Sequence, residues 1–204
     1  YDDVAVMAKH IDAKEAIRLS EKAIQKKKQI LGENTLSVIY NYLTLGEIYL
    51  ANDDPKRSAE YLDRAKSMIE SSKEPENAKK CDIYYEMCEA FNFSSRPKDT
   101  INFCKKSLEC IAKFPSKNNQ ETLFKEGRTT EMLAQNHIAI GEFDQGLEFY
   151  KKNNQILEKS FPQKENAYYF AHGQNLMKMA NIYSEKKDFK EAINTLNNAI
   201  DRSE

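Results

Sequence analysis

Residues 175–200 predict a hairpin of two amphipathic helices joined by a tight charged turn at residues 185–188. In the first half, the apolar side chains recur with the helical period on one face: Leu176, Met179, Ala180 and Tyr183. The second half carries a similar face: Phe189, Ala192, Ile193, Leu196, Ala199 and Ile200. Ala180 and Ala192 stand where two antiparallel helices approach most closely, so their small side chains let the backbones pack together.

The same hairpin recurs upstream, at spacings of 46, 46 and 42 residues. The position of Ala180 is taken by Ala134, Cys88 and Gly46 in the earlier copies. Recurring small or aromatic positions are predicted to hold the fold together: Gly46, Ser58, Ala65, Ala134, Gly146, Ala180, Tyr183, Ala192 and Ala199. A single hairpin cannot bury its apolar face, so the copies must stack on one another. We therefore expect one all-α repeat domain over residues 1–204, with a partial copy at 1–32 and full copies at 33–74, 75–117, 118–162 and 163–204.

These recurring positions resemble the tetratricopeptide repeat (TPR). Leu45-Gly46-x2-Tyr49 carries the Leu-Gly-x2-Tyr core of that family, and Gly141-Glu-Phe143-x2-Gly146 resembles its turn motif. The 42-residue spacing is similar to that of kinesin light chain repeats. The resemblance implies a right-handed superhelical solenoid of antiparallel helix–turn–helix repeats. Prolines and capping residues such as Asp54, Pro55, Pro97 and Asp188 mark the expected helix ends. Helices are expected near 1–11, 13–31, 35–52, 55–72, 75–94, 97–113, 118–140, 143–160, 164–186 and 188–203.

Composition narrows the possible functions. The net charge is −1, which gives no case for nucleic acid binding. No apolar run approaches the ~20 residues needed to cross a bilayer. The four cysteines, Cys81, Cys88, Cys104 and Cys110, show no metal-binding spacing and are expected to be reduced, as in a cytoplasmic protein. The chain opens within a helical pattern, and we expect it to be part of a longer protein.

No catalytic, cofactor or metal site is predicted. The three histidines, His10, His137 and His172, are isolated in the sequence, and His137 stands at an aromatic position of its repeat. The sequence therefore favours a non-enzymatic protein without a cofactor.

The TPR resemblance implies that the first helix of each repeat lines a concave groove. Its exposed positions would hold the partner-binding residues Tyr40, Leu43, Glu47, Asp82, Tyr85, Glu86, Glu89, Arg128, Glu131, Gln135, Gln174, Met177, Lys178 and Asn181. Five of these are acids and two are bases, so the expected partner is a basic or amphipathic protein segment seated on Tyr40, Tyr85 and Met177. The alternative is that the acids only keep an unoccupied face soluble.

The function expected from these features is a protein–protein interaction scaffold or adaptor in a larger complex. The kinesin light chain-like spacing suggests a cytoskeletal, motor-linked or ciliary setting in the cytoplasm. The alternative is a peptide-sensing regulatory domain, similar to bacterial quorum-response regulators with TPR repeats.

Overall fold

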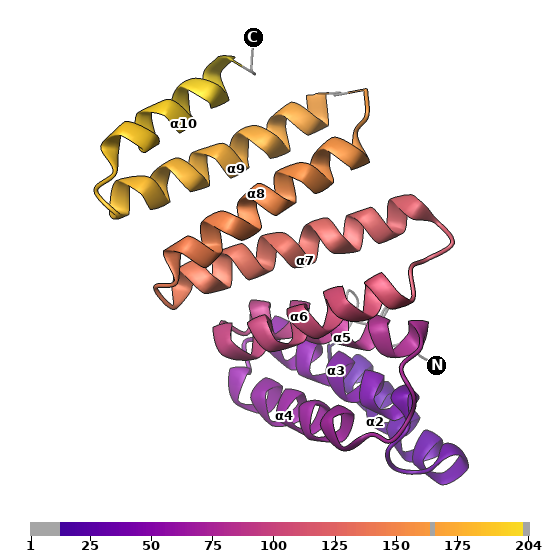
Figure 1. The fold of residues 1–204 in the computed structure, drawn as a ribbon. Coiled ribbons are helices and arrows are strands. Elements are labelled where there is room, and N and C mark those ends of the chain that lie inside the picture. The colour runs from indigo at the N-terminus through magenta and orange to yellow at the C-terminus, as the bar shows by residue number, and fades with distance from the viewer. Residues whose placement is uncertain (1–12, 164–165, 202–204) are drawn as a thin grey trace. The chain divides into compact units, whose positions relative to one another are not determined.

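The computed structural model describes residues 13–163 and 166–201, and within these ranges the chain forms nine helices and no strand (Figure 1). The helices are α2 (Ala13–Leu31), α3 (Leu36–Ala51), α4 (Pro55–Ser71), α5 (Ala78–Phe93), α6 (Pro97–Lys113), α7 (Asn119–Ala139), α8 (Phe143–Ser160), α9 (Asn166–Glu185) and α10 (Phe189–Asp201). The all-α prediction is confirmed. The helix expected near residues 1–11, which is the first helix of the partial repeat and contains His10, lies outside the described residues.

Local signals in the sequence fix most helix starts. Asp54 accepts a hydrogen bond from the backbone N–H of Arg57, and Pro55 occupies the first turn of α4, where its missing N–H costs no helical bond. Helix α5 begins at Ala78, three residues later than expected. The reason is Asn77, whose side chain accepts from the backbone N–H of Lys80 and so caps the helix there.

The turn inside each full repeat has the same backbone geometry. The seventh residue after the small position has a positive φ in all four copies: Asp53 (57°), Ser95 (54°), Gly141 (82°) and Lys187 (62°). The next residue donates its backbone N–H back to the preceding helix each time, as from Asp54 to the Tyr49 carbonyl at 2.9 Å and from Asp188 to the Tyr183 carbonyl at 2.8 Å. A shared left-handed residue at one register position supports the repeat assignment independently of the apolar pattern.

The chain divides into two compact units, residues 1–114 and 115–204. In the first unit, α3 packs against α2, α4 and α5, and α5 packs against α6. In the second unit, α7, α8, α9 and α10 pack in sequence, each against the next (Figure 1). Within each unit, successive helices therefore pack against one another, as the repeat pattern predicts.

The recurring small residues lie at the closest helix contacts. A Cβ atom on Gly46 would lie 2.6 Å from Leu62 Cδ2, and one on Gly146 would lie 2.6 Å from Ile138 Cγ1. The other buried members of the set are Ser58, Ala65, Ala134, Ala180 and Ala192, whereas Tyr183 and Ala199 are partly buried against the core formed by α7, α8 and α9.

The four cysteines are not reduced. Cys81 is bonded to Cys110 and Cys88 to Cys104, with Cα atoms 5.3 and 4.9 Å apart. Both bonds join α5 to α6, and all four side chains are buried. The prediction of free thiols was wrong because antiparallel packing of the two helices brings the cysteines together in pairs. The cytoplasmic location inferred partly from free thiols loses that support.

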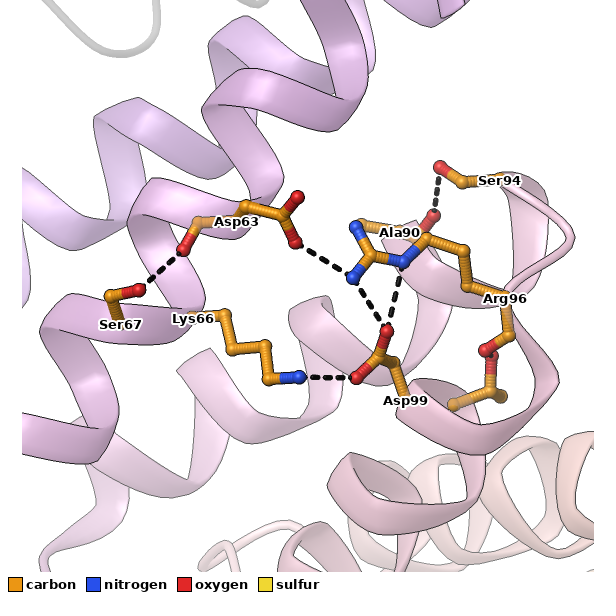
Figure 2. Close-up of polar contacts among 8 residues, drawn as sticks. Asp63, Lys66, Ser67, Ala90, Ser94, Arg96 and Asp99 are labelled. Atoms are coloured by element: carbon orange, nitrogen blue, oxygen red, sulfur yellow. Dashed lines mark hydrogen bonds and ion pairs between the residues drawn. The ribbon is translucent and has the colours of Figure 1, made fainter.

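An ionic network joins the second helices of two successive repeats in the first unit. Asp99, in the first turn of α6, accepts from Lys66 Nζ on α4 at 2.6 Å and from Arg96 Nη2 at 2.6 Å. Arg96 also contacts Asp63 on α4 at 2.7 Å (Figure 2). The Arg96 guanidinium lies over the Phe91 ring, 4.5 Å from its centre. Two positive and two negative groups thus link α4 to the start of α6 in addition to the apolar core.

Candidate functional site

The face formed by α7 and α9 holds a cluster of charged and polar side chains around one carboxylate. Glu131 on α7 accepts from Lys178 Nζ on α9 at 2.8 Å and from Gln135 Nε2 at 3.1 Å. Arg128 Nη1 lies 3.6 Å from the other oxygen of Glu131. We call Arg128, Glu131, Gln135 and Lys178 the Glu131 cluster. Because two cations surround its one carboxylate, this cluster has a net positive charge.

Tyr150 of α8 forms part of the floor beneath this cluster. Its side chain is 1% exposed, and the Lys178 ammonium lies 5.7 Å from the centre of its ring. Burial and the nearby negative charge of Glu131 raise the pKa of the Tyr150 hydroxyl, although a hydrogen bond with Gln135 acts in the opposite direction. The phenol therefore stays neutral at physiological pH and acts as a packing and hydrogen-bonding group.

A hollow of about 310 Å³ lies on one side of the Glu131–Lys178 ion pair; we call it the amide hollow. It is lined by apolar groups, among them Leu123, Phe124 and Ile156, and by the amides of Gln120 and Gln174. An asparagine network forms its base. Asn175 donates to Asn153 at 2.7 Å and to Asn154 at 2.8 Å, and Asn153 donates to the Gly127 carbonyl at 2.6 Å.

A second hollow, of about 490 Å³, lies on the other side of the ion pair; we call it the tyrosine hollow. Its walls include Gln135 and Ile138 from α7, Tyr150 from α8, and Lys178 and Asn181 from α9. The same register positions form a hollow of about 420 Å³ in the first unit, where Glu47 and Leu50 of α3, Leu62 of α4 and Phe93 of α5 line it. The repeat therefore produces a similar hollow between successive first helices in both units.

Half of the residues predicted to bind a partner line these hollows: Glu47, Arg128, Glu131, Gln135, Gln174, Lys178 and Asn181. Asp82 and Met177 are exposed, and Tyr40, Glu86 and Glu89 are partly buried. A role of any of them in partner binding stays a prediction.

Two of the predicted groove residues are not exposed. Leu43 is 2% exposed and Tyr85 is 6% exposed. The expected exposure was wrong because α3 is packed against α2, α4 and α5, and α5 against α3, α4 and α6, which leaves these side chains within the core. At the equivalent position of the last repeat, Met177 remains 52% exposed.

Several site residues were missed by sequence reasoning. Phe124 and Gln120 precede the positions that the TPR resemblance marks, because α7 extends further toward the chain start than a shorter repeat requires. The 46-residue spacing of this repeat could have indicated these residues, because a longer first helix supplies additional residues that line the groove. Asn153 and Asn175 were not predicted as site residues, and their mutual hydrogen bond has no sequence signature.

The two histidines that the structure describes, His137 and His172, are both buried. His137 is buried, stacks on Phe149 with ring centres 5.3 Å apart, and lies 2.5 Å from a carboxylate oxygen of Glu142. Across residues 13–163 and 166–201, no three His, Cys, Asp or Glu side chains are grouped so as to hold a metal ion. Among the helices that the structure describes, none has the length and apolar character of a membrane-spanning segment.

Comparisons with known proteins agree with this fold. The tetratricopeptide repeat family model matches residues 173–204. A search of curated protein sequences finds no match. Among solved structures, nearly identical TPR-like repeats assigned to a kinesin light chain of Podosopora anserina superpose with a TM-score of 0.72 at 15% identity, covering 98% of this chain and 92% of that one.

Two further structures show the same helical architecture. MamA superposes with a TM-score of 0.62 at 18% identity, covering 98% of this chain and 88% of MamA. A signal transduction ATPase from Pyrococcus horikoshii with a tetratricopeptide repeat sensor superposes with a TM-score of 0.65 at 17% identity, covering 98% of this chain and 28% of the ATPase. The chain therefore has a TPR-like helical repeat fold, and residues 173–204, within its last repeat, match the tetratricopeptide repeat family model.

Proposed function

We propose that this chain is a non-catalytic protein-interaction module that holds an extended peptide segment against α7 and α9. The observation that carries the proposal is the pair of hollows on either side of the Glu131–Lys178 ion pair. A peptide crossing the ion pair would place apolar side chains in the two hollows. TPR-like folds generally mediate protein–protein contacts, which supports the same reading.

The chemistry of the walls suits a peptide backbone. Gln120, Gln174 and Asn181 carry amide groups that can both donate and accept hydrogen bonds. Such groups satisfy the N–H and C=O groups of an extended segment without selecting its side chains. Apolar contacts with Phe124 and Ile138 would then select the side chains that enter the hollows.

The charge expected of the partner changes with position along the chain. Four of the five predicted acids belong to the first unit: Glu47, Asp82, Glu86 and Glu89. Glu131, the fifth, is paired with Lys178, so it contributes no net attraction for a basic peptide. A basic segment is proposed for the face of α3 and α5, because these four acids belong to those two helices, and reversal of Glu86 and Glu89 to Lys should weaken its binding.

A peptide library tests the proposal directly. Random peptides would be selected on the immobilised chain, and the affinity of each selected peptide measured by fluorescence anisotropy. Gln174→Arg and Asn181→Arg, both at exposed positions, should each weaken binding by about tenfold or more. Gln155→Arg, at an exposed position of α8, is the matched control and should leave the affinity within about twofold. Selected peptides that respond equally to all three changes would contradict the proposal.

The cellular setting is also a proposal. The likeness to kinesin light chain repeats suggests a motor-linked or cytoskeletal adaptor in the cytoplasm, and the likeness to the sensor region of the Pyrococcus horikoshii ATPase suggests a peptide sensor as the alternative. A sensor should change its hydrodynamic radius when a selected peptide saturates it, whereas a passive adaptor should not.

A further inference from the structure

The hollow between α3 and α5 in the first unit combines an apolar wall with an acid; we call it the Glu47 hollow. Its apolar lining includes Leu50 of α3, Leu62 of α4 and Ala90 of α5. Among the described residues that line it, Glu47 is the one charged side chain, and it is partly buried. An apolar side chain filling the hollow would remove water from this carboxylate and supply no charge in return. A cation on an apolar stem suits both parts of the wall.

The tyrosine hollow of the second unit has different chemistry at the same register positions. Gln135 stands there at the position of Glu47, and Lys178 stands at the position of Glu86. The second unit thus carries a cation of its own at this wall, paired with Glu131. The first unit carries acids at both positions, so its wall favours a cation supplied by a partner.

The Glu47 hollow also lies at the carboxyl ends of two helices. Leu50 and Ala51 belong to the last turn of α3, and Ala90 and Phe93 belong to the last turn of α5. The last turn of a helix carries a partial negative charge from its aligned carbonyl groups, which favours a nearby cation. The two helix ends and the Glu47 carboxylate therefore attract the same kind of group.

Phe93 adds an aromatic surface to the hollow. Its side chain is 64% exposed and forms part of the lining. A guanidinium is planar and weakly hydrated, so it can stack on a ring while it pairs with a carboxylate, whereas an ammonium is compact and strongly hydrated. The same chain shows this arrangement at Arg96, whose guanidinium lies 4.5 Å from the centre of the Phe91 ring while it pairs with Asp99. The combination of ring and carboxylate favours arginine over lysine.

We propose that the Glu47 hollow is an arginine-binding subsite. The arginine of a partner segment lays its apolar stem against Leu50 and Ala90. Its guanidinium stacks on Phe93 and pairs with Glu47. The proposal rests on the basic segment proposed for the face of α3 and α5, and it adds which side chain of that segment is recognised and where. It concerns the first unit alone and is separate from the peptide site on α7 and α9.

The probe is a tripeptide with arginine between two glycines, blocked at both ends. It is titrated into the isotope-labelled 204-residue chain, and binding is followed by NMR. The amide shifts should saturate at residues of α3 and α5 that line the hollow, with a dissociation constant on the order of millimolar for this single side chain. The lysine tripeptide should bind more weakly by about threefold or more. The citrulline and leucine tripeptides, which carry no charge, should bind more weakly by about tenfold or more.

Two substitutions separate the roles of the acid and the ring. Glu47→Gln should weaken binding of the arginine tripeptide by about fivefold or more and reduce its advantage over the citrulline tripeptide. Phe93→Asn should weaken binding by about threefold or more and reduce the preference for arginine over lysine. The matched controls are Glu109→Gln, at an exposed position of α6, and Phe189→Asn, at a phenylalanine of α10 that is 60% exposed. Each control should leave the affinity within about twofold.

Several results would overturn the proposal. They are the absence of saturable binding, shifts confined to helices other than α3 and α5, equal binding of the citrulline or leucine tripeptide, and binding that ignores both Glu47→Gln and Phe93→Asn. Longer basic peptides that weaken on reversal of Glu86 and Glu89 but ignore Glu47→Gln would overturn the subsite and leave the basic segment standing. Arginine tripeptide binding that depends on Glu47 and Phe93 would support the subsite even if the selection of longer peptides failed, so the two proposals are tested separately.

Discussion

Cys88 of α5 is bonded to Cys104 of α6 at the same pair of register positions where Gly46 meets Leu62 one repeat earlier. In that earlier repeat, a Cβ atom on Gly46 would lie only 2.6 Å from Leu62 Cδ2. The third repeat thus replaces a close van der Waals contact between its two helices with a covalent bond.

The other disulfide also joins two register positions that lie close together in a neighbouring repeat. Cys81 and Cys110 stand at the register positions of Gly127 and Ile156 in the next repeat, where a Cβ on Gly127 would lie 3.6 Å from Ile156 Cγ2. Each disulfide therefore joins positions that also face each other across the helix pair of a neighbouring repeat, and both keep the register of the fold.

Removal of the disulfides should destabilise the first unit. Closure of loops with sequence separations of 16 and 29 residues is worth about 3 kcal/mol each in the chain-entropy account. We expect reductant to lower the urea midpoint of the wild type. A variant with all four cysteines changed to alanine should unfold at a lower urea concentration and should not respond to reductant.

Thiol counting provides the control. Protein purified without reductant and then denatured should show no free thiol, and reduced protein should show four. Four thiols before reduction would contradict the disulfide assignment.

Glycine substitutions should have opposite effects at two helical positions. Gly46→Ala forces Leu62 to move, because Cδ2 and Cγ would lie 2.6 and 2.8 Å from the new methyl group, and should destabilise the chain by about 1–3 kcal/mol. At Gly173 in α9, nothing lies within 4 Å of an added Cβ, so Gly173→Ala should stabilise by roughly 0.5–1 kcal/mol through helix propensity. Urea titration of both variants measures the change in the free energy of unfolding. Equal changes for the two variants would refute the close contact between Gly46 and Leu62.

The contribution of Asp99 should depend on pH. Burial disfavours its charged form, but hydrogen bonds from Lys66 and Arg96 and the charges of both outweigh burial and lower the pKa of Asp99 below its ordinary value of 3.8. A lowered folded-state pKa gives stability that is fully present above the unfolded value and is lost as the pH falls through the folded value. Asp99→Asn should therefore cost about 1 kcal/mol near neutral pH, allowing for solvent screening, and less below pH 3.8.

Urea titrations of the wild type and Asp99→Asn from neutral pH down to acid pH measure this difference. Glu148→Gln, at an exposed position of α8, is the control for a lost surface carboxylate. If the difference in the free energy of unfolding between wild type and Asp99→Asn grew as the pH fell, the direction of the Asp99 pKa shift would be contradicted.

The fold was predictable because every repeat needs a small residue at the same position, where its two helices pack most closely. Close packing of the two helices requires a small residue at one position of each repeat, which is occupied by Gly46, Cys88, Ala134 and Ala180. Alignment of the repeats on this position therefore also aligned their helices. Helix ends followed from side chains such as Asp54, whose capping role depends only on local geometry.

The pairing of the cysteines had a signal that went unused. In an antiparallel helix hairpin, facing residues have position numbers with a nearly constant sum, and the numbers of the two bonded pairs, Cys81 with Cys110 and Cys88 with Cys104, have almost the same sum. The burial of Leu43 and Tyr85 had no such signal, because it depends on how many neighbours surround a helix and not on its own sequence. For the same reason, the pairing of Glu131 with Lys178, 47 residues away, could not be read from the charges alone.

The central claim, that this chain binds peptides between α7 and α9, is tested most directly by locating a bound peptide. Hydrogen–deuterium exchange of the chain with and without a selected peptide would be compared for each helix. We predict slower exchange in α7 and α9 on binding, and loss of that protection in Asn181→Arg but not in Gln155→Arg. Protection confined to α8, α10 or the first unit, or protection that survives Asn181→Arg, would contradict the claim.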